Sequence, residues 1–155
     1  MERNRATPAV YLLLQRGGEI LLMRRKGSYY NDWYTVPAGH VEAGELPTEA
    51  LARETKEEVG ITINPNDVQL AHTMYRTKHD ETGDRVDLFY SVKSWSGEIA
   101  NMEPEKCSEI GWFSRTSLPE KLMHHVGRAI LDIEKGVSTS ELSLEEVALN
   151  PTKPT

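Results

Sequence analysis

Three glutamates of one short segment, Glu54, Glu57 and Glu58, have the spacing of a metal-binding cluster. On a helix, side chains three and four positions apart lie on one face, so these carboxylates would converge. Like charges at that spacing cost an isolated helix about 0.2–0.5 kcal/mol per pair. A hard divalent cation that prefers oxygen ligands would turn this repulsion into attraction. The alternative interpretation is a solvated acidic helix face.

The surrounding segment, GHVEAGELPTEALARETKEEVGI, carries the signals of a helix that would position these carboxylates. We predict a helix over residues 48–59, because Pro47 suits the first turn and Gly60 suits the position just past the end. Arg53 stands four residues before Glu57 and can hold one carboxylate in place. The buried stripe of this helix is expected to be Leu51, Thr55 and Val59.

The remaining sequence predicts a mixed sheet and one more helix. The second helix is expected over residues 119–135, with an apolar stripe on one side and Gly136 at its end. Residues 137–155 are polar and we expect a flexible tail, so one domain extends over residues 5–136. The fold class is therefore α+β, an α/β/α sandwich with a mixed β-sheet and two main helices. The predicted strands are residues 9–15, 19–25, 34–38, 67–77, 85–95 and 109–113.

The composition is that of an ordinary globular domain of 155 residues, with a formal net charge of −6. The acidic balance and the lack of a long Lys/Arg run argue against binding to bulk nucleic acid. No apolar run has the length of a membrane span, and the polar start MERNRATP does not read as a signal peptide. The one cysteine, Cys107, cannot form an internal disulfide, which fits a cytoplasmic protein.

The glutamate-rich segment resembles the Nudix box, the motif of the Nudix (MutT-like) hydrolase superfamily. One position departs from the family pattern, because Thr55 stands where an apolar side chain is usual. Thr55 is close to valine in shape, so this departure concerns packing and not chemistry. The resemblance implies the Nudix fold over roughly residues 5–135. The fixed positions of the motif are matched by Gly39, Glu45, Arg53, Glu54, Glu57, Glu58, Gly60 and Ile61.

The resemblance implies an enzyme that hydrolyses a diphosphate linkage in a nucleoside diphosphate joined to another group, using Mg²⁺ or sometimes Mn²⁺. By this resemblance Glu57 and Glu58 are the principal metal ligands, and Glu54 is a further ligand or the general base. The backbone carbonyl of Gly39 joins the metal shell. Arg53 orients a glutamate and belongs with the three glutamates in the catalytic machinery.

Two glutamates outside the motif are further candidates, because many family members add an acidic residue from a loop. Glu105 is expected at the metal and Glu103 at the substrate. For both, ordinary surface charge is the alternative interpretation.

Cationic and aromatic side chains follow the second predicted strand. Arg24 and Arg25 could bind substrate phosphates, since the guanidinium fork matches phosphate oxygens. Tyr30 and Trp33 could stack on a nucleobase. The alternatives are a solvated strand end for the arginines and core or rim packing for the aromatic rings.

Four functions remain open on the sequence. The favoured one is a pyrophosphohydrolase that converts a nucleoside triphosphate, oxidised ones included, to the monophosphate and pyrophosphate. The second is hydrolysis of ADP-ribose, a nucleotide sugar or a dinucleotide. The third is a non-catalytic nucleotide-binding regulatory domain, although such domains usually lose the box glutamates. The fourth, an isoprenyl diphosphate isomerase, would need a reactive cysteine motif. The expected partner is a small-molecule nucleotide, and homodimerisation is left open.

Overall fold

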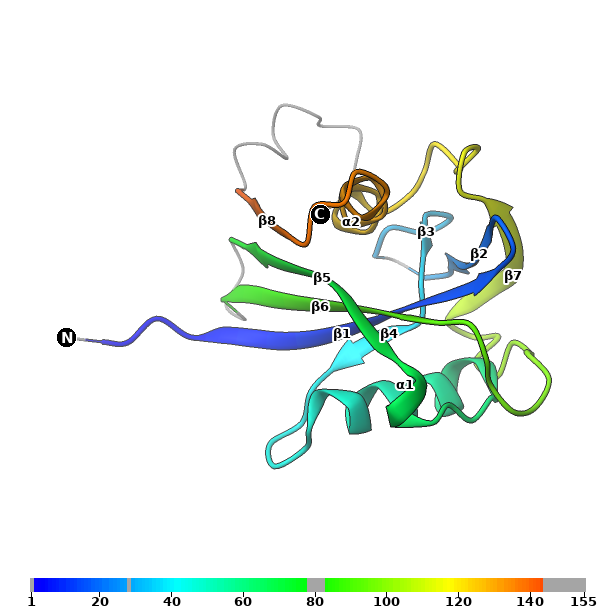
Figure 1. The fold of residues 1–155 in the computed structure, drawn as a ribbon, viewed down its shortest axis with the longest axis horizontal. Helices are drawn as coiled ribbons and strands as arrows, with labels where there is room; N and C mark the ends of the chain where they lie inside the picture. Colours follow the sequence, from blue (N-terminus) through cyan, green and yellow to red (C-terminus); the bar gives the residue numbers. More distant parts are fainter. Residues whose placement is uncertain (1, 28, 78–82, 144–155) are drawn as a thin grey trace.

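Two helices lie on opposite sides of a mixed β-sheet in the computed structural model, which describes residues 2–27, 29–77 and 83–143 (Figure 1). The strand order is β3-β2-β1-β6-β5-β8, with β4 paired to β1 and β7 paired to β2. The predicted α+β class is confirmed. The elements are β1 (Ala6–Arg16), β2 (Glu19–Arg25), β3 (Tyr34–Thr35), β4 (Ala38–His40), α1 (Pro47–Val59), a short 3₁₀ helix (Pro65–Asp67), β5 (Gln69–Arg76), β6 (Asp84–Val92), β7 (Cys107–Ser114), α2 (His124–Glu134) and β8 (Thr139–Leu142).

Strand β1 is the centre of the sheet and separates two apolar cores. It runs parallel to β6 and antiparallel to β2 and β4. Successive side chains of a strand point to opposite faces, so a strand covered on both faces is apolar throughout. Tyr11 and Leu13 therefore join the core beneath α2, while Leu12 and Leu14 join the core beneath α1. The apolar run of this strand thus holds both helices in place.

Helix α1 begins and ends as its sequence predicts. The side chain of Glu49 accepts a hydrogen bond from the backbone N–H of Leu46 at 2.9 Å, which satisfies a donor at the first turn. Gly60 ends the helix with φ of 77°, a left-handed conformation that glycine adopts without strain. Thr55 is buried, and its hydroxyl donates to the carbonyl of Leu51 at 2.6 Å. The hydroxyl at this usually apolar position is therefore satisfied inside the helix.

Helix α2 begins later than the sequence predicted, at His124 and not near residue 119. The preceding residues pair with β3 instead. The N–H of Tyr34 donates to the carbonyl of Lys121 at 2.7 Å, and the N–H of Met123 donates to the carbonyl of Tyr34 at 2.9 Å. This pairing uses backbone groups that a longer helix would need, so the apolar Leu122 lies in an extended segment.

The start of the predicted flexible tail differs from the prediction, because residues Thr139–Leu142 form strand β8. This strand runs parallel to β5, and Leu142 is buried in the core beneath α2. The buried ring of His72 joins the two segments, since its Nδ1 lies 2.9 Å from the carbonyl of Val137 and its Nε2 lies 2.8 Å from the hydroxyl of Ser140. Residues 144–155 lie outside the described residues.

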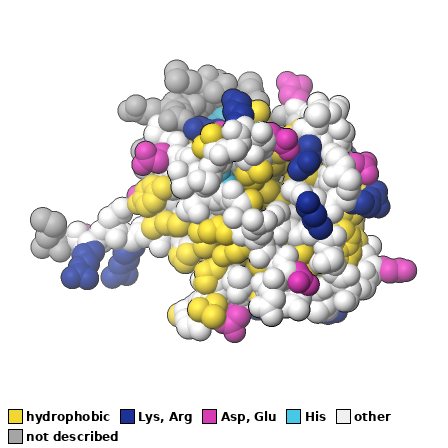
Figure 2. All heavy atoms as spheres, in the orientation of Figure 1, with side chains coloured by type: hydrophobic (Ala, Val, Ile, Leu, Met, Phe, Trp, Pro, Cys, Tyr) yellow, Lys and Arg dark blue, Asp and Glu magenta, His cyan; other side chains and the backbone are white. Residues whose placement is uncertain are grey.

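The surface is mixed in character on the face drawn in Figure 2. Apolar side chains gather across the middle of this face, and the Lys and Arg side chains lie toward its margins in small groups rather than in one patch. Among the described residues, no helix is long and apolar enough to cross a membrane.

Candidate metal and substrate site

The carboxylates of α1 face strand β4 at close range. Glu58 Oε2 accepts a hydrogen bond from the backbone N–H of Ala38 at 3.1 Å. A Cβ atom added to Gly39 would lie only 2.1 Å from the carboxyl carbon of Glu54. The strand backbone therefore approaches Glu54 so closely that any side chain at position 39 would displace the Glu54 carboxylate. This contact places the Gly39 backbone beside the acidic cluster, as the sequence motif led us to expect.

Arg53 holds the carboxylates in a fixed arrangement. Its guanidinium binds both oxygens of Glu45, at 2.9 and 3.1 Å, and one oxygen of Glu54 at 2.8 Å. It also donates to the carbonyl of His40 at 3.2 Å. The Glu57 carboxylate is farther away, 3.7 Å from Nη1. Arg53 therefore lies closer to the carboxylate of Glu54 than to that of Glu57, the residue four positions after it.

Burial and mutual repulsion shift the acidity of these groups. The pKa of Glu58 is raised to about 8, chiefly by burial; the hydrogen bond from the Ala38 N–H lowers it, and the charges of Glu54, Glu103 and Glu57 raise it. Burial also raises the pKa of Glu54, although Arg53 opposes this. A cation bound among these groups would favour their charged forms. Because these carboxylates are difficult to ionise without a positive charge nearby, a bound cation would stabilise their charged forms.

The donors present are all oxygens, which fits a hard cation such as Mg²⁺. Within residues 2–27, 29–77 and 83–143, no three acidic, histidine or cysteine side chains are already gathered into a metal cage. Mg²⁺ does not need such a cage, because it keeps several waters and takes only one or two carboxylates along with substrate phosphates. Glu57 and Glu58, with Glu54 and the Gly39 carbonyl beside them, could hold it.

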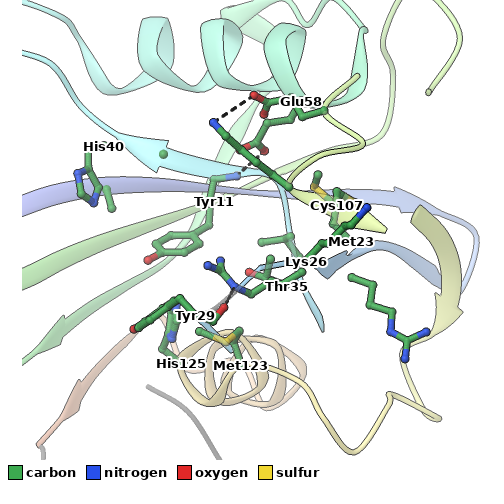
Figure 3. A pocket seen from close by; sticks show the side chains of 18 of the residues that line it. Tyr11, Met23, Lys26, Tyr29, Thr35, His40, Glu58, Cys107, Met123 and His125 are labelled. Atoms are coloured by element: carbon green, nitrogen blue, oxygen red, sulfur yellow. Dashed lines mark hydrogen bonds and ion pairs between the residues drawn. The ribbon is translucent and has the colours of Figure 1, made fainter. Parts of the chain in front are cut away.

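A cavity of about 370 Å³ opens next to Glu58 and Gly39. Figure 3 shows Glu58 extending from α1 on one side of this cavity, with Tyr11, Met123 and His125 on the other side of β1. A cavity of this size is within the range of small-molecule sites. It therefore extends from the acidic face of α1 to the first turn of α2.

The cationic residues predicted to bind phosphate do line this cavity. Arg24 and Arg25 reach it from the end of β2. Arg24 Nε lies 3.4 Å from Asp32, so part of its charge is compensated. Arg25 donates to the carbonyl of Tyr29 at 3.2 Å, and its guanidinium lies 5.1 Å from the centre of the Tyr29 ring.

The aromatic residues predicted at the substrate are placed differently. Tyr30 and Trp33 pack against the core beneath α2 and are not among the residues that line the cavity. Their neighbour Tyr29 lines it, with half of its surface exposed. The two tyrosines are adjacent in the sequence, and Tyr30 has a left-handed backbone with φ of 49°, which no sequence pattern here indicated.

The two glutamates outside the motif are also separated by the structure. Glu103 lines the cavity, and its carbonyl accepts the N–H groups of Lys106 and Cys107, which closes a turn there. Glu105 lies on the exposed side of this turn and does not line the cavity. The fold therefore brings Glu103, and not Glu105, toward the α1 carboxylates.

Several cavity residues were missed by the sequence interpretation. Tyr11, Arg76, Arg85 and His125 line the cavity from four different elements. The available signal was the presence of charged residues at positions of the predicted strands that alternate with outward-facing ones, as with Arg76 and Arg85. A buried charge needs a partner or a function.

Comparison with known proteins agrees with the motif. Residues 3–132 match the family model of the NUDIX domain. The chain is 32% identical over 115 residues to a NAD-capped RNA hydrolase NudC from Stutzerimonas stutzeri (strain A1501), a match that covers 74% of this chain and 39% of that protein. It is 28% identical over 120 residues to an ADP-ribose pyrophosphatase from Methanocaldococcus jannaschii, covering 76% of this chain and 69% of that protein.

The fold is also similar to solved structures. A MutT NUDIX hydrolase from Burkholderia pseudomallei superposes with a TM-score of 0.75 at 26% identity, and the match covers 83% of this chain and 98% of that one. The chain spans 39% of the length of the first relative above, so the similarity to that protein concerns one part of it.

Proposed function

Because the chain belongs to the Nudix family, we propose that it is a Mg²⁺-dependent pyrophosphohydrolase of a small nucleotide substrate. The observation that carries the proposal is the close packing of the α1 carboxylates against Gly39 at the edge of a cavity that also contains arginines. Carboxylates can hold a cation, arginines can hold phosphates, and residues of both kinds line the same cavity. Mn²⁺ would serve the same oxygen donors.

In the proposed reaction a water oxygen attacks one phosphorus of the diphosphate, and the bond from that phosphorus to the bridging oxygen breaks. Bound Mg²⁺ supplies charge neutralisation and a lower pKa for the attacking water. Glu57 and Glu58 hold the cation. Glu54, oriented by Arg53 at 2.8 Å, is placed to accept the proton of the water. General-base help of this kind contributes about 10²–10⁴-fold.

The cationic rim has a binding role in this proposal. Arg25 and Lys26 bind the phosphate oxygens and align them with the acidic face of α1. Tyr29, at the rim beside Arg25, offers a flat surface to the rest of the nucleotide. Positioning of this sort accounts for a large share of the rate enhancement in phosphoryl transfer.

We propose a nucleoside triphosphate, cleaved to the monophosphate and pyrophosphate, as the substrate class. A compact cavity of about 370 Å³ suits such a substrate better than a dinucleotide with two nucleosides. The relatives named above favour a second candidate. One of them is named as an ADP-ribose pyrophosphatase, so ADP-ribose, nucleotide sugars and dinucleotides are the alternative class.

The test measures release of monophosphate, phosphate and pyrophosphate with Mg²⁺ over a panel of canonical and oxidised nucleoside triphosphates, ADP-ribose, nucleotide sugars and dinucleoside polyphosphates. Turnover of one class, abolished by Glu57→Gln and retained by Glu120→Gln, is the expected result. Glu120 is an exposed glutamate outside the cavity, which makes it the matched control. Nucleotide binding without turnover of any compound would overturn the proposal in favour of a regulatory domain.

A further inference from the structure

The loop between β6 and β7, residues 93–106, joins the acidic end of the cavity, where the carboxylates of α1 lie, to the cationic end of β2. On one side the N–H of Met102 donates to the backbone carbonyl of Glu58 at 3.1 Å. On the other side the N–H of Lys26 donates to the carbonyl of Lys106 at 2.9 Å. The loop is therefore attached both to the helix that carries the acidic cluster and to the segment that carries the cations.

A compact turn at the end of this loop sets the positions of Glu103 and Lys106. The N–H groups of Lys106 and Cys107 both donate to the carbonyl of Glu103, at 2.9 and 3.0 Å. The side chain of Asn101 braces the turn, because it donates to the carbonyl of Cys107 at 2.7 Å and accepts from the N–H of Glu103 at 3.2 Å. Figure 3 shows Cys107 and Glu58 at the same end of the cavity. One braced turn thus presents a carboxylate and an ammonium group to the cavity, since Glu103 and Lys106 both line it.

These two side chains form an exposed ion pair. Nζ of Lys106 lies 3.5 Å from Oε2 of Glu103, and the two side chains are 72% and 27% exposed. Ion pairs between exposed side chains stabilise a protein little, and the flexible stem of lysine lets its ammonium group reach several positions. Lys106 can therefore leave Glu103 for another anion at small cost.

The neighbours of Glu103 make this pair sensitive to a bound cation. The charge of Glu103 contributes to the raised pKa of both Glu54 and Glu58, so the three carboxylates act on one another. In the metal-free protein the Lys106 ammonium supplies a positive charge beside this group. A divalent cation among the carboxylates would neutralise the charge that attracts Lys106 and would repel the ammonium. A phosphate bound in the same cavity would then be its attractive partner.

We propose that Lys106 is a phosphate-binding residue that Glu103 holds in the metal-free protein and that turns to the outermost phosphate of a nucleoside triphosphate once a divalent cation is bound. This inference rests on the proposed function, since it places the substrate phosphates beside the cation. Lys106 then has two opposite effects. It competes with the cation for Glu103, and it strengthens the binding of a phosphate chain long enough to reach it. A monophosphate lacks the outer phosphates and gains nothing from Lys106.

The experiment measures three affinities by calorimetry, without turnover. The ligands are Mg²⁺ alone, a non-hydrolysable nucleoside triphosphate analogue, and the monophosphate of the same nucleoside, and both nucleotides are titrated in Mg²⁺ and in EDTA. Lys106→Met removes the ammonium group from an exposed position and keeps a side chain of similar length. Lys93→Met is the matched control, because Lys93 is an exposed lysine of the same loop and is not among the residues that line the cavity.

The expected signature of Lys106→Met is a pair of changes with opposite signs. Without nucleotide it should bind Mg²⁺ about two- to threefold more tightly, because a competing charge is gone. In Mg²⁺ it should bind the triphosphate analogue about tenfold more weakly and the monophosphate with unchanged affinity. Lys93→Met should change none of these affinities. A lysine that only stabilised the turn would not strengthen the binding of Mg²⁺.

Glu103→Gln tests the holding role of Glu103. In EDTA, where Glu103 holds Lys106, Lys106→Met should weaken the binding of the triphosphate analogue by less than about twofold. In the Glu103→Gln protein the ammonium is released, so the same substitution should weaken it about fivefold in EDTA. The difference between the two backgrounds measures the coupling of this pair.

An unchanged affinity of Lys106→Met for Mg²⁺ or for the analogue in Mg²⁺ would overturn the proposal. An equal loss for the monophosphate, or equal effects of Lys106→Met in the two backgrounds, would overturn it as well. Failure of the proposed function is a separate result, because the unmodified protein would then release no product from any compound of the panel.

Discussion

The Arg53 side chain is the residue on which the geometry of the acidic cluster depends. It binds Glu45 through two hydrogen bonds and Glu54 through one. Arg53→Lys keeps the charge but cannot bind both carboxylates in this way. We expect kcat to fall about 10–100-fold with a smaller change in KM, the usual cost of losing a group that orients a metal ligand. Steady-state kinetics will check this. Lys56→Gln, an exposed cation on the same helix, should change neither parameter, and an unchanged kcat for Arg53→Lys would contradict the role.

The absence of a side chain at Gly39 leads to a second prediction. A Cβ atom there would lie 2.1 Å from the Glu54 carboxyl carbon, so Gly39→Ala must displace that carboxylate. We expect a loss of kcat of about 10² or more, because a general base acts only at hydrogen-bond distance. Gly18→Ala is the matched control, since a Cβ at position 18 meets nothing within 4 Å. If the two variants were equally active, the position of the Glu54 carboxylate beside Gly39 would not matter for catalysis.

The partly buried carboxyl of Glu58 links stability to pH. Its pKa rises from an ordinary value of 4.5 to about 8 in the folded protein, chiefly through burial. Between these two values the folded state binds more protons than the unfolded state, so stability falls as the pH rises. In EDTA, the melting temperature should therefore decrease from pH 5 to pH 8, and Glu58→Gln should lessen this decrease. Mg²⁺ should raise the melting temperature at pH 8 more than at pH 5. Melting curves that are independent of pH in EDTA would contradict the burial of a titrating Glu58.

At the scale of helices and strands, the sequence predicted the elements whose ends are set by residues nearby in the chain. Helix α1 follows from Pro47, its glutamate cap and Gly60. The beginning of α2 and the whole of β8 depend on partners far away in the sequence. Leu122 pairs with Tyr34 and is thereby kept out of the helix. Strand β8 is short and mostly polar, so its apolar pattern is too weak to indicate a strand without β5 beside it.

Strand β8 should contribute to stability in spite of its polar sequence. Leu142 is 2% exposed and belongs to the core beneath α2. Leu142→Ala should lower the free energy of unfolding by about 2 kcal/mol, the low end of the range for buried leucines, because a sheet edge can partly relax around the lost side chain. Urea denaturation gives the value. The neighbouring Glu141→Ala is exposed and should change it by less than about 0.5 kcal/mol. Equal effects would mean that β8 does not pack in solution.

At the scale of the whole molecule, the site has two parts. The residues of one part come from a single segment of the sequence, and those of the other come from elements that are far apart in the sequence. The acidic end lies almost entirely within the Gly39–Ile61 segment, so fixed spacing predicted it. The other end combines Tyr11, Arg76, Arg85 and His125, which come from four elements. No local spacing relates such residues. The parallel pairing of β1 with β6 and the antiparallel pairing of β5 with β6, which sets Arg76 opposite Arg85, bring three of these elements together.

The charge distribution of the whole protein predicts coupling between metal and nucleotide. The net charge is −6, and the reacting end of the cavity carries the α1 carboxylates, so a nucleotide phosphate is repelled there unless a cation intervenes. We expect Mg²⁺ to strengthen the binding of a non-hydrolysable nucleoside triphosphate analogue about tenfold, a coupling of about 1.4 kcal/mol. Thermodynamic linkage requires the analogue to strengthen Mg²⁺ binding by the same factor. Calorimetry checks this by titrating the analogue with and without Mg²⁺, and Mg²⁺ with and without the analogue. Glu57→Gln should reduce both factors by the same amount. If the unmodified protein bound the analogue equally well in Mg²⁺ and in EDTA, the phosphates would lie away from the acidic end of the cavity.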